Sequence, residues 1–371
     1  MRAISNLYDK MTKYDFALVF IAVGIVIIGL VNLYSATHTS AFEGSAAFFR
    51  NQIIFASIGI VLMIVFIIVD YRNIDRIAYP AYIINILLLV LVLVAGHSAM
   101  GGRRWLSLGF MKFQPSEFMK LTMVWALVKF FNNDRNIHGY TLQELTIPFA
   151  MIGIPFMLIL AQPDLGTAMM HGLVGMTILV FVGIQRRSLI TLIMIGVISV
   201  PVVYSFVLKD YQKKRVLTFI DPSRDPKGSG YNSLQSKIAV GSGQFLGKGF
   251  MKGTQTQLNF LPEHHTDFIF SVFGEEHGFV GTAFLVVLYT LLFFAGVRIS
   301  SKARDKLGAL LAIGCISVLF WHAFINMGMV IGVMPVVGVT LPFMSYGGTS
   351  IILNFVLIGV IQNVAVRRFM F

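Results

Sequence analysis

Charged residues are scarce in this chain. Asp, Glu, Lys and Arg make up 12% of its 371 residues, whereas soluble domains carry about 25%. So low a density cannot cover the surface of a chain of this length with solvated groups. Together with a hydrophobic content of 56% and a mean hydropathy of +0.79, it excludes an ordinary soluble protein and indicates an integral membrane protein.

Cysteine is almost absent. Cys315 is the single cysteine of the chain, so neither an internal disulfide nor a cysteine-based metal site is available. It lies within the apolar run 310–320. We expect its side chain to pack between helices.

Acidic residues are outnumbered by basic ones. The chain has 29 Lys and Arg against 17 Asp and Glu, which gives a net charge of +12. In a soluble protein this excess would suggest nucleic acid. In a membrane protein it is typical of cytoplasmic loops and of binding to anionic membrane lipids, so we expect no nucleic-acid partner.

Two kinds of motif are also missing. The closest internal echo, 114–117 against 162–165, is too short for the inverted repeats of secondary transporters. The glycine-rich stretch 241–253 has no preceding strand and no GKS or GKT ending, which excludes a nucleotide-binding P-loop. Its glycines would still let the backbone approach a polar ligand closely.

Long apolar stretches, by contrast, are abundant. A spanning helix needs about 20 mostly apolar residues. Stretches of this kind lie at roughly 16–34, 52–69, 77–96, 117–132, 145–161, 167–184, 188–208, 279–297, 307–334 and 349–366. We therefore predict an all-α integral membrane protein, a single polytopic domain over 1–371 with about ten transmembrane helices and a large extracytoplasmic loop, 209–278, between helices 7 and 8.

The distribution of Lys and Arg predicts the orientation. If the N-terminus is inside, the cytoplasmic segments hold most of the basic residues near span ends, and the short outer loops hold only Arg50, Arg103, Arg104 and Lys112. The long basic stretch 209–266 then lies outside, because long loops translocate largely regardless of charge. We expect a multi-pass protein of the cytoplasmic (inner) membrane with both termini cytoplasmic.

Acidic residues in or beside the apolar spans are expensive and therefore informative. Glu117 and Lys120, at i and i+3, project from one helix face, either as a structural ion pair or in a coupling or substrate role. Asp164 follows Pro163 in a tight turn, where it either caps the next helix or projects with Gln162 into an outward-facing cavity.

The outer loop carries two further candidates. Lys213, Lys214 and Arg215 form a basic cluster that is either a solvated loop or an anion site for a phosphate or pyrophosphate. In the run 261–270, Thr266 can cap a helix whose first turn holds Asp267, and the dipole would favour an ionised carboxylate there. Such a carboxylate could accept a proton from a substrate hydroxyl. His264 and His265 are adjacent and lie in no HExxH motif, so we expect no structural metal.

Short motifs follow one another in a fixed order from about residue 103 to the end. They are FQPSE at 113–117, AQPDLGT at 161–167, YQ at 211–212 with Arg215, GY at 230–231, QSKIA at 235–239, GKG at 247–249, GTQ at 253–255, LPE at 261–263 running on to Phe270, GEE at 274–276 and PFMSYGG at 342–348. On these motifs the chain resembles the SEDS family (shape, elongation, division and sporulation). Lys237, the glycine motifs and the short tails resemble its elongation branch, the RodA proteins, more than its division branch, the FtsW proteins.

The resemblance implies a peptidoglycan glycosyltransferase that polymerises lipid II into glycan strands during cell elongation. It places the catalytic general base at Asp267 and implies a class B penicillin-binding protein, elongation-complex membrane proteins and membrane lipids as partners. A divalent cation is compatible with this chemistry, although no ligand set is visible. The substrate-binding residues it suggests are Arg103, Arg104, Lys213, Lys214, Arg215, Gln235, Ser236, Lys237, His265 and Thr266, with Gln162, Asp164 and Ser345 as polar residues of a cavity.

Three other interpretations stay open. Ten spans with buried charges also suit a lipid II flippase or transporter, although a carrier needs a midplane site with inner and outer gates. A non-catalytic scaffold for a penicillin-binding protein would leave the acid at Asp267 unexplained. The division-specific member of the family is the third alternative.

Overall fold

A computed structural model describes residues 15–38, 45–99, 102–107, 112–134, 136, 139–202, 205, 213, 217–219, 221, 225, 228–258, 260–261 and 263–368. Within these residues seven helices are long and apolar enough to cross a membrane. They are α2 (Phe16–Thr37), α3 (Ser45–Ile68), α4 (Arg72–Ala95), α7 (Leu165–Val182), α12 (Ile269–Ser301), α13 (Lys306–Ile331) and α14 (Gly348–Arg367). The predicted helical membrane fold is confirmed.

Three more helices account for the remaining predicted spans. They are α5 (Pro115–Asn132), which carries Glu117 and Lys120, α6 (Thr146–Ala161) and α8 (Arg186–Val202). Between α8 and α12 lie two shorter helices, α10 (Ser229–Ser242) and α11 (Thr254–Gln257). Because α12 begins at Ile269, the last part of the predicted loop 209–278 is helical.

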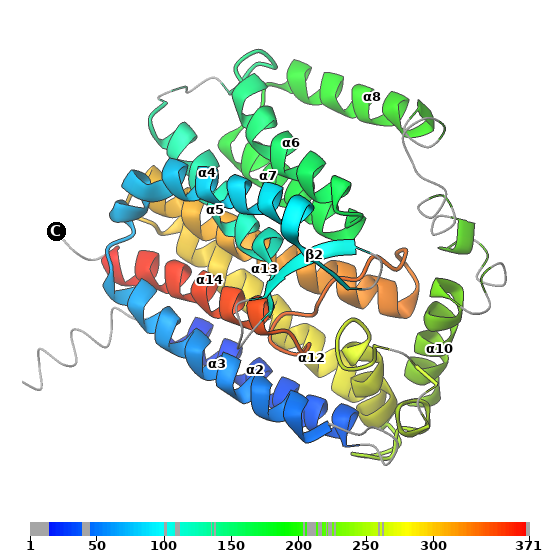
Figure 1. Cartoon of the computed structure of the whole chain (residues 1–371). Helices are drawn as coiled ribbons and strands as arrows, with labels where there is room; N and C mark the ends of the chain where they lie inside the picture. The colour runs from blue at the N-terminus through cyan, green and yellow to red at the C-terminus, as the bar shows by residue number, and fades with distance from the viewer. Residues whose placement is uncertain are drawn as a thin grey trace, which may run out of the picture.

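A small antiparallel sheet, β1-β2-β3, joins α4 to α5 and was not predicted. Its strands are β1 (His97–Ala99), β2 (Gly102–Ser107) and β3 (Lys112–Phe113), with Ser98 opposite Arg103 and Leu106 opposite Phe113. The strands are too short for a recognisable alternating pattern. The sheet leans on the end of α4 (Figure 1).

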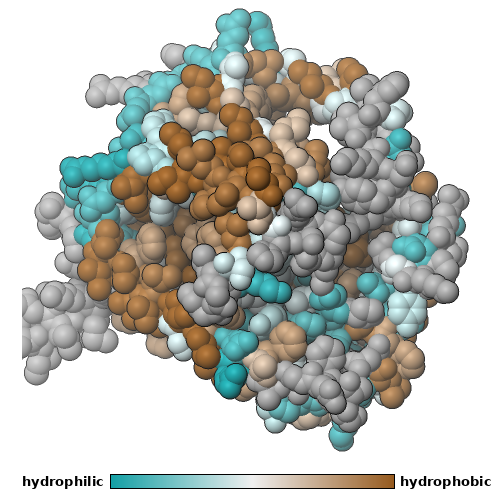
Figure 2. Space-filling view, in the orientation of Figure 1, coloured by the Kyte–Doolittle hydropathy of each residue, from teal (hydrophilic) through white to brown (hydrophobic). Residues whose placement is uncertain are grey.

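The helix α14 forms the centre of the bundle. It is mostly apolar and has no continuous polar face, as is typical of a helix that is surrounded on all sides; all its residues from Thr349 to Val366 are buried. It lies between α3 on one side and α13 and α5 on the other (Figure 1). By contrast, α3 and α4 leave large apolar side chains exposed along their length, among them Ile58, Val61, Leu87 and Val94. Broad hydrophobic areas on the visible face in Figure 2 are the surface expected against lipid.

The connections divide between two ends of the bundle. One end, called here the site end, carries the sheet, α10, the turn 263–268 and the segment 332–347; the other carries the last residue of α14 (Figure 1). The far end holds Arg72, Lys129, Arg186, Arg298, Lys306 and Arg367 next to helix termini.

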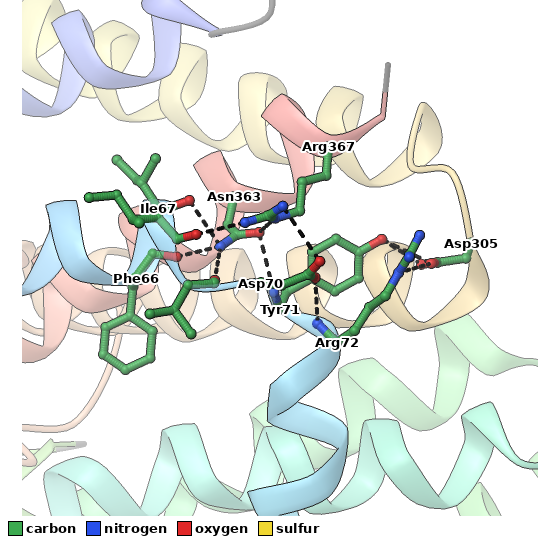
Figure 3. A network of polar contacts seen from close by, with 10 residues as sticks. Phe66, Ile67, Asp70, Tyr71, Arg72, Asp305, Asn363 and Arg367 are labelled. Atoms are coloured by element: carbon green, nitrogen blue, oxygen red, sulfur yellow. Dashed lines mark hydrogen bonds and ion pairs between the residues drawn. The ribbon is translucent and has the colours of Figure 1, made fainter. Parts of the chain in front are cut away.

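A polar network fastens three helices at the far end (Figure 3). The Asn363 amide donates to the carbonyl oxygens of Phe66, Ile67 and Val69 at the end of α3. The Tyr71 hydroxyl donates to both carboxylate oxygens of Asp305, at 3.0 and 2.9 Å, and Asp305 in turn caps α13 by accepting from the Gly308 amide. Burial is the larger cause, and the hydrogen bond to Asp305 the next, of a pKa of Tyr71 raised to about 12. The phenol therefore keeps its proton and stays a donor.

The helix α12 is broken at Gly278, whose φ of 63° lies in the left-handed region. The break frees backbone groups, and the loop 244–249 binds them. The Lys248 and Gly249 amides donate to the carbonyls of Glu275 and Glu276, and the Phe279 and Val280 amides donate to the carbonyls of Gln244 and Phe245. A side chain at Gly247 would collide with the Glu276 carbonyl. The loop thus completes the hydrogen bonding of a spanning helix.

Candidate functional site

One extended stretch, the 335–347 segment between α13 and α14, organises the site end. Along it, Val337 lies against Gly166 of α7, where a Cβ would collide with the Val337 carbonyl, and Gly338 lies against Asp267. The Asn326 amide donates to the Val339 carbonyl at 2.6 Å, and the His322 ring donates to the Thr340 carbonyl at 3.1 Å. This one segment therefore contacts α7, α13 and the turn that carries Asp267.

Asp267 lies in the turn 263–268 that precedes α12. The prediction that Thr266 caps the helix was wrong, because α12 has Phe268 at its N-cap position with no side-chain cap. Thr266 instead donates to the Glu263 carboxylate at 2.9 Å, closing the turn on itself. Asp267 is partly exposed. It stands just before the N-terminus of α12, which is the positive end of the helix dipole.

The turn is tied to the 335–347 segment by its backbone. The Ser345 hydroxyl donates to the Thr266 carbonyl at 2.6 Å, and the Tyr346 amide donates to the His265 carbonyl at 2.9 Å. The Asn326 amide donates to the carbonyl of Asp267 itself at 2.8 Å. At Gly338, φ is 74°, and a Cβ there would stand 3.2 Å from the Asp267 carboxylate. Ser345, predicted as a cavity residue, is buried and holds the turn.

The two histidines of the turn, His264 and His265, contact other parts of the protein. Both ring nitrogens of His264 face carbonyl oxygens, of Leu261 at 2.8 Å and of Ala36 at 3.0 Å, so neither is turned toward a metal. The His265 ring lies 4.9 Å from that of Phe48, and burial, followed by the neighbouring His264, lowers its pKa. Among the residues described, no group of three or more His, Cys, Asp or Glu could hold a metal ion.

Asp164 caps α7, by accepting from the Thr167 amide at 3.1 Å. It also pairs with Arg104 of β2 at 3.6 Å, while the same guanidinium donates to the carbonyls of Gln162 and Pro163. The Gln162 amide donates to the Leu89 carbonyl at 3.1 Å. Of the two readings of Asp164, the geometry supports the cap. Arg104 is engaged with protein groups and fastens the sheet to the α6–α7 turn.

The pair Glu117 and Lys120 is buried and has a third member. The ammonium lies 2.7 Å from the Glu117 carboxylate and 2.5 Å from Nε2 of His322 on α13. Because an ammonium can only donate, Nε2 must be the acceptor, and the proton of the neutral ring is on Nδ1, which faces the Thr340 carbonyl. His322 therefore links the pair to the 335–347 segment.

The predicted cations of the outer loop are placed in part. Lys214, Arg215 and the side chain of Arg103 lie outside the described residues, and Lys213 donates to the Ser205 carbonyl at 3.1 Å. On α10, Ser236 is buried and donates to the Val330 carbonyl at the end of α13, and Gln235 beside it is half-buried. Lys237 lies over the backbone of Gly332. It has no hydrogen-bond or ion-pair partner among the described residues.

Sequence reasoning missed Asn326 and Gly338, and it also missed the contact of His322 with Lys120. Asn326 is a polar side chain in the middle of an apolar run, which is itself an indication of a special role. Its partners at 267 and 339 are set by tertiary contact and leave no local pattern.

Similar proteins identify the family to which the chain belongs. Residues 16–369 match the profile of the FtsW/RodA/SpoVE family of cell cycle proteins. The chain is 40% identical over 312 residues to the peptidoglycan glycosyltransferase MrdB of Escherichia coli, with 84% of each chain covered. It is 36% identical to stage V sporulation protein E of Bacillus subtilis, over 96% of this chain and 98% of that protein.

Solved structures show the same fold. A chain from a study of how a peptidoglycan synthase complex coordinates polymerization and crosslinking superposes with a TM-score of 0.83 at 31% identity, over 96% of this chain and 99% of that one. The rod shape-determining protein RodA of Thermus thermophilus superposes with a TM-score of 0.71 at 29% identity, over 96% and 98%. Given the matched profile and the shared fold, this multi-pass membrane protein belongs to the SEDS family of FtsW, RodA and SpoVE proteins.

Proposed function

We propose that the protein is a peptidoglycan glycosyltransferase that polymerises lipid II during cell elongation. The observation that carries this is the placement of Asp267, a partly exposed carboxylate at the site end, held by the 335–347 segment and at the positive end of α12. The relative named for this activity is similar over most of the chain. The division-specific activity is the alternative within the family.

In the proposed reaction Asp267 is the general base. It takes the proton of the acceptor's GlcNAc 4-hydroxyl, the oxygen attacks the anomeric carbon of the lipid-linked donor from the face opposite the leaving group, and the bond to undecaprenyl pyrophosphate breaks. The anomeric configuration is inverted. A general base of this kind contributes about 10²–10⁴-fold to the rate.

The leaving pyrophosphate needs cations. Of the predicted set, Lys237 is the described cation best suited, because its ammonium has no partner within the part of the chain that the structure describes, while Arg104 is already engaged with Asp164. Lys237 lies at Gly332 and Asp267 at Gly338 of the same connection. The cluster Lys213, Lys214 and Arg215 is proposed to add charge, since clustered cations form strong bonds to phosphate oxygens.

The proposed orientation puts the site end outside the cytoplasmic membrane. The far end carries the basic residues beside helix termini, as the positive-inside rule requires of a cytoplasmic face. Lipid II is then met on the outer face. We propose a class B penicillin-binding protein as partner; the similar chain of known structure comes from a complex that combines polymerization with crosslinking.

The test is polymer synthesis from lipid II by the purified protein with its partner. Asp267→Asn keeps the size of the side chain and removes the base, so polymer formation should fall at least about a hundredfold while the protein stays folded. Lys237→Met should raise the KM for lipid II in a salt-dependent manner, and Lys252→Met serves as the matched loop control. Normal polymer from Asp267→Asn, or lipid II transport across vesicles without polymer, would overturn the proposal.

A further inference from the structure

Two polar residues of α13 stand between the buried ion pair and the turn of Asp267. His322 and Asn326 are four residues apart and therefore lie one above the other on the same helix face. Both are buried, at 4% and 0% exposure. Both donate to carbonyls of the 335–347 segment, His322 to Thr340 and Asn326 to Val339.

Asn326 makes the more direct connection. Its amide group has two protons, and two carbonyls lie within reach, of Val339 at 2.6 Å and of Asp267 at 2.8 Å. One side chain thus fixes the distance between the turn of Asp267 and the segment that faces it. The residue before Val339 is Gly338, where a Cβ would stand 3.2 Å from the Asp267 carboxylate.

His322 depends on the ion pair for its role. Lys120 occupies Nε2, so the ring must carry its proton on Nδ1, and only this tautomer can donate to the Thr340 carbonyl. The Lys120 ammonium is held in turn by Glu117. The connected path is therefore Glu117, Lys120, His322, Thr340 and the 338–339 backbone, with Asn326 closing it onto Asp267.

We propose that Asn326 and His322 are positioning residues that hold the 338–340 backbone against Asp267, with Lys120 selecting the ring tautomer of His322. This rests on the proposed function insofar as Asp267 is the base. Position matters at such a site, because a displacement of about 1 Å can cost about a hundredfold in rate. Neither residue is proposed to touch the substrate.

A labelling experiment tests the positioning apart from catalysis. Cys315 is fully buried, so the thiol introduced by Asp267→Cys is the accessible one. We expect Asn326→Leu in this background to raise the rate of modification by a water-soluble maleimide at least about threefold, because the covering segment is released. The matched control is Ser317→Ala, a buried polar residue of α13 that bonds within its own helix. Equal rates in the Asn326→Leu and control backgrounds would overturn the proposal.

Activity gives the second measurement. Asn326→Leu in the otherwise natural chain should lower kcat by about ten- to a hundredfold with KM for lipid II within about twofold, since geometry and not binding is lost. If Asp267→Asn retains activity, the general-base assignment fails while the labelling result still decides the positioning.

Two amide variants, His322→Asn and His322→Gln, distinguish a positioning role of His322 from a role limited to accepting a hydrogen bond from Lys120. His322→Asn puts its amide where Nδ1 was and can still donate to Thr340, whereas His322→Gln reaches only toward Lys120. We expect His322→Asn to keep at least about threefold more kcat than His322→Gln. The reverse order would show that His322 serves only to accept from Lys120, and would overturn its positioning role.

Discussion

The ion pair of α5 offers a prediction whose size follows from burial. The Lys120 side chain is 0% exposed and that of Glu117 is 9% exposed, with 2.7 Å between the charged atoms. Glu117→Gln keeps the shape and an acceptor oxygen but leaves the buried ammonium without a counter-charge. Breaking a buried pair in this way costs about 3–5 kcal/mol. We expect a loss of unfolding free energy of that order.

An exposed pair provides the matched control. Arg72 and Asp305 lie 3.9 Å apart with side chains 52% and 35% exposed. Arg72→Met should therefore cost no more than about 1 kcal/mol. The double variant Glu117→Gln with Lys120→Met removes both charges and should be less destabilised than the sum of its single variants.

The assay is denaturant unfolding in detergent micelles, followed by tryptophan fluorescence; Trp125 is buried on the same helix. A Glu117→Gln loss no larger than that of Arg72→Met would refute the reasoning from burial. Polymer synthesis with and without the penicillin-binding partner provides a functional measurement. We expect Glu117→Gln to change the ratio of the activity with the partner to the activity without it. Charge reversal at both positions should restore it only in part, because a carboxylate at 120 would face the lone pair of His322.

The remaining predictions concern the loop and the turn. Glu275 is fully buried and accepts from Lys248 at 2.7 Å and from Thr254 at 3.0 Å; Glu275→Gln should make the loop 248–255 more sensitive to limited proteolysis, and unchanged cleavage kinetics would contradict this. Burial lowers the pKa of His265 below its unfolded value of about 6.5, so below about pH 6.5 the unfolded state binds more protons and the folded state loses stability. His265→Gln should lessen this loss of stability, measured in thermal melts between pH 7 and pH 5. An identical pH dependence in the variant would count against the prediction. Neutralising Lys213, Lys214 and Arg215 together should weaken lipid II binding most at low salt, and equal affinity at low salt would return the cluster to a solvated loop.

The membrane fold could be predicted because each spanning helix is encoded by one contiguous run of apolar residues that is long enough to cross a membrane. Asp267 could be selected from the sequence as a candidate, since it follows a recognisable motif and an acidic residue beside a span is energetically costly; its role stays a prediction. The cap at Asp164 followed from its place after Pro163 and before α7.

What could not be predicted depends on contacts between distant parts of the chain. Thr266 is a residue type that often caps helices, but its hydroxyl donates to the nearby Glu263 carboxylate, and α12 begins only at Ile269. Asn326 finds Asp267, 59 positions away in sequence, only because α13 passes the start of α12. The sheet of β1 to β3 is too short to leave a period-two pattern.

The break in α12 has a consequence for how the chain is made. Its freed carbonyls and amides would each cost several kcal/mol without partners in the membrane, and these partners are backbone groups of residues 244–249. That loop leaves the ribosome before residues 275–280, so it can be waiting at the site end when α12 inserts. Shortening the loop 244–249 would then hinder the insertion of α12 during biogenesis. The defect would appear as failed membrane integration and rapid degradation of the protein, before any loss of polymer synthesis could be measured.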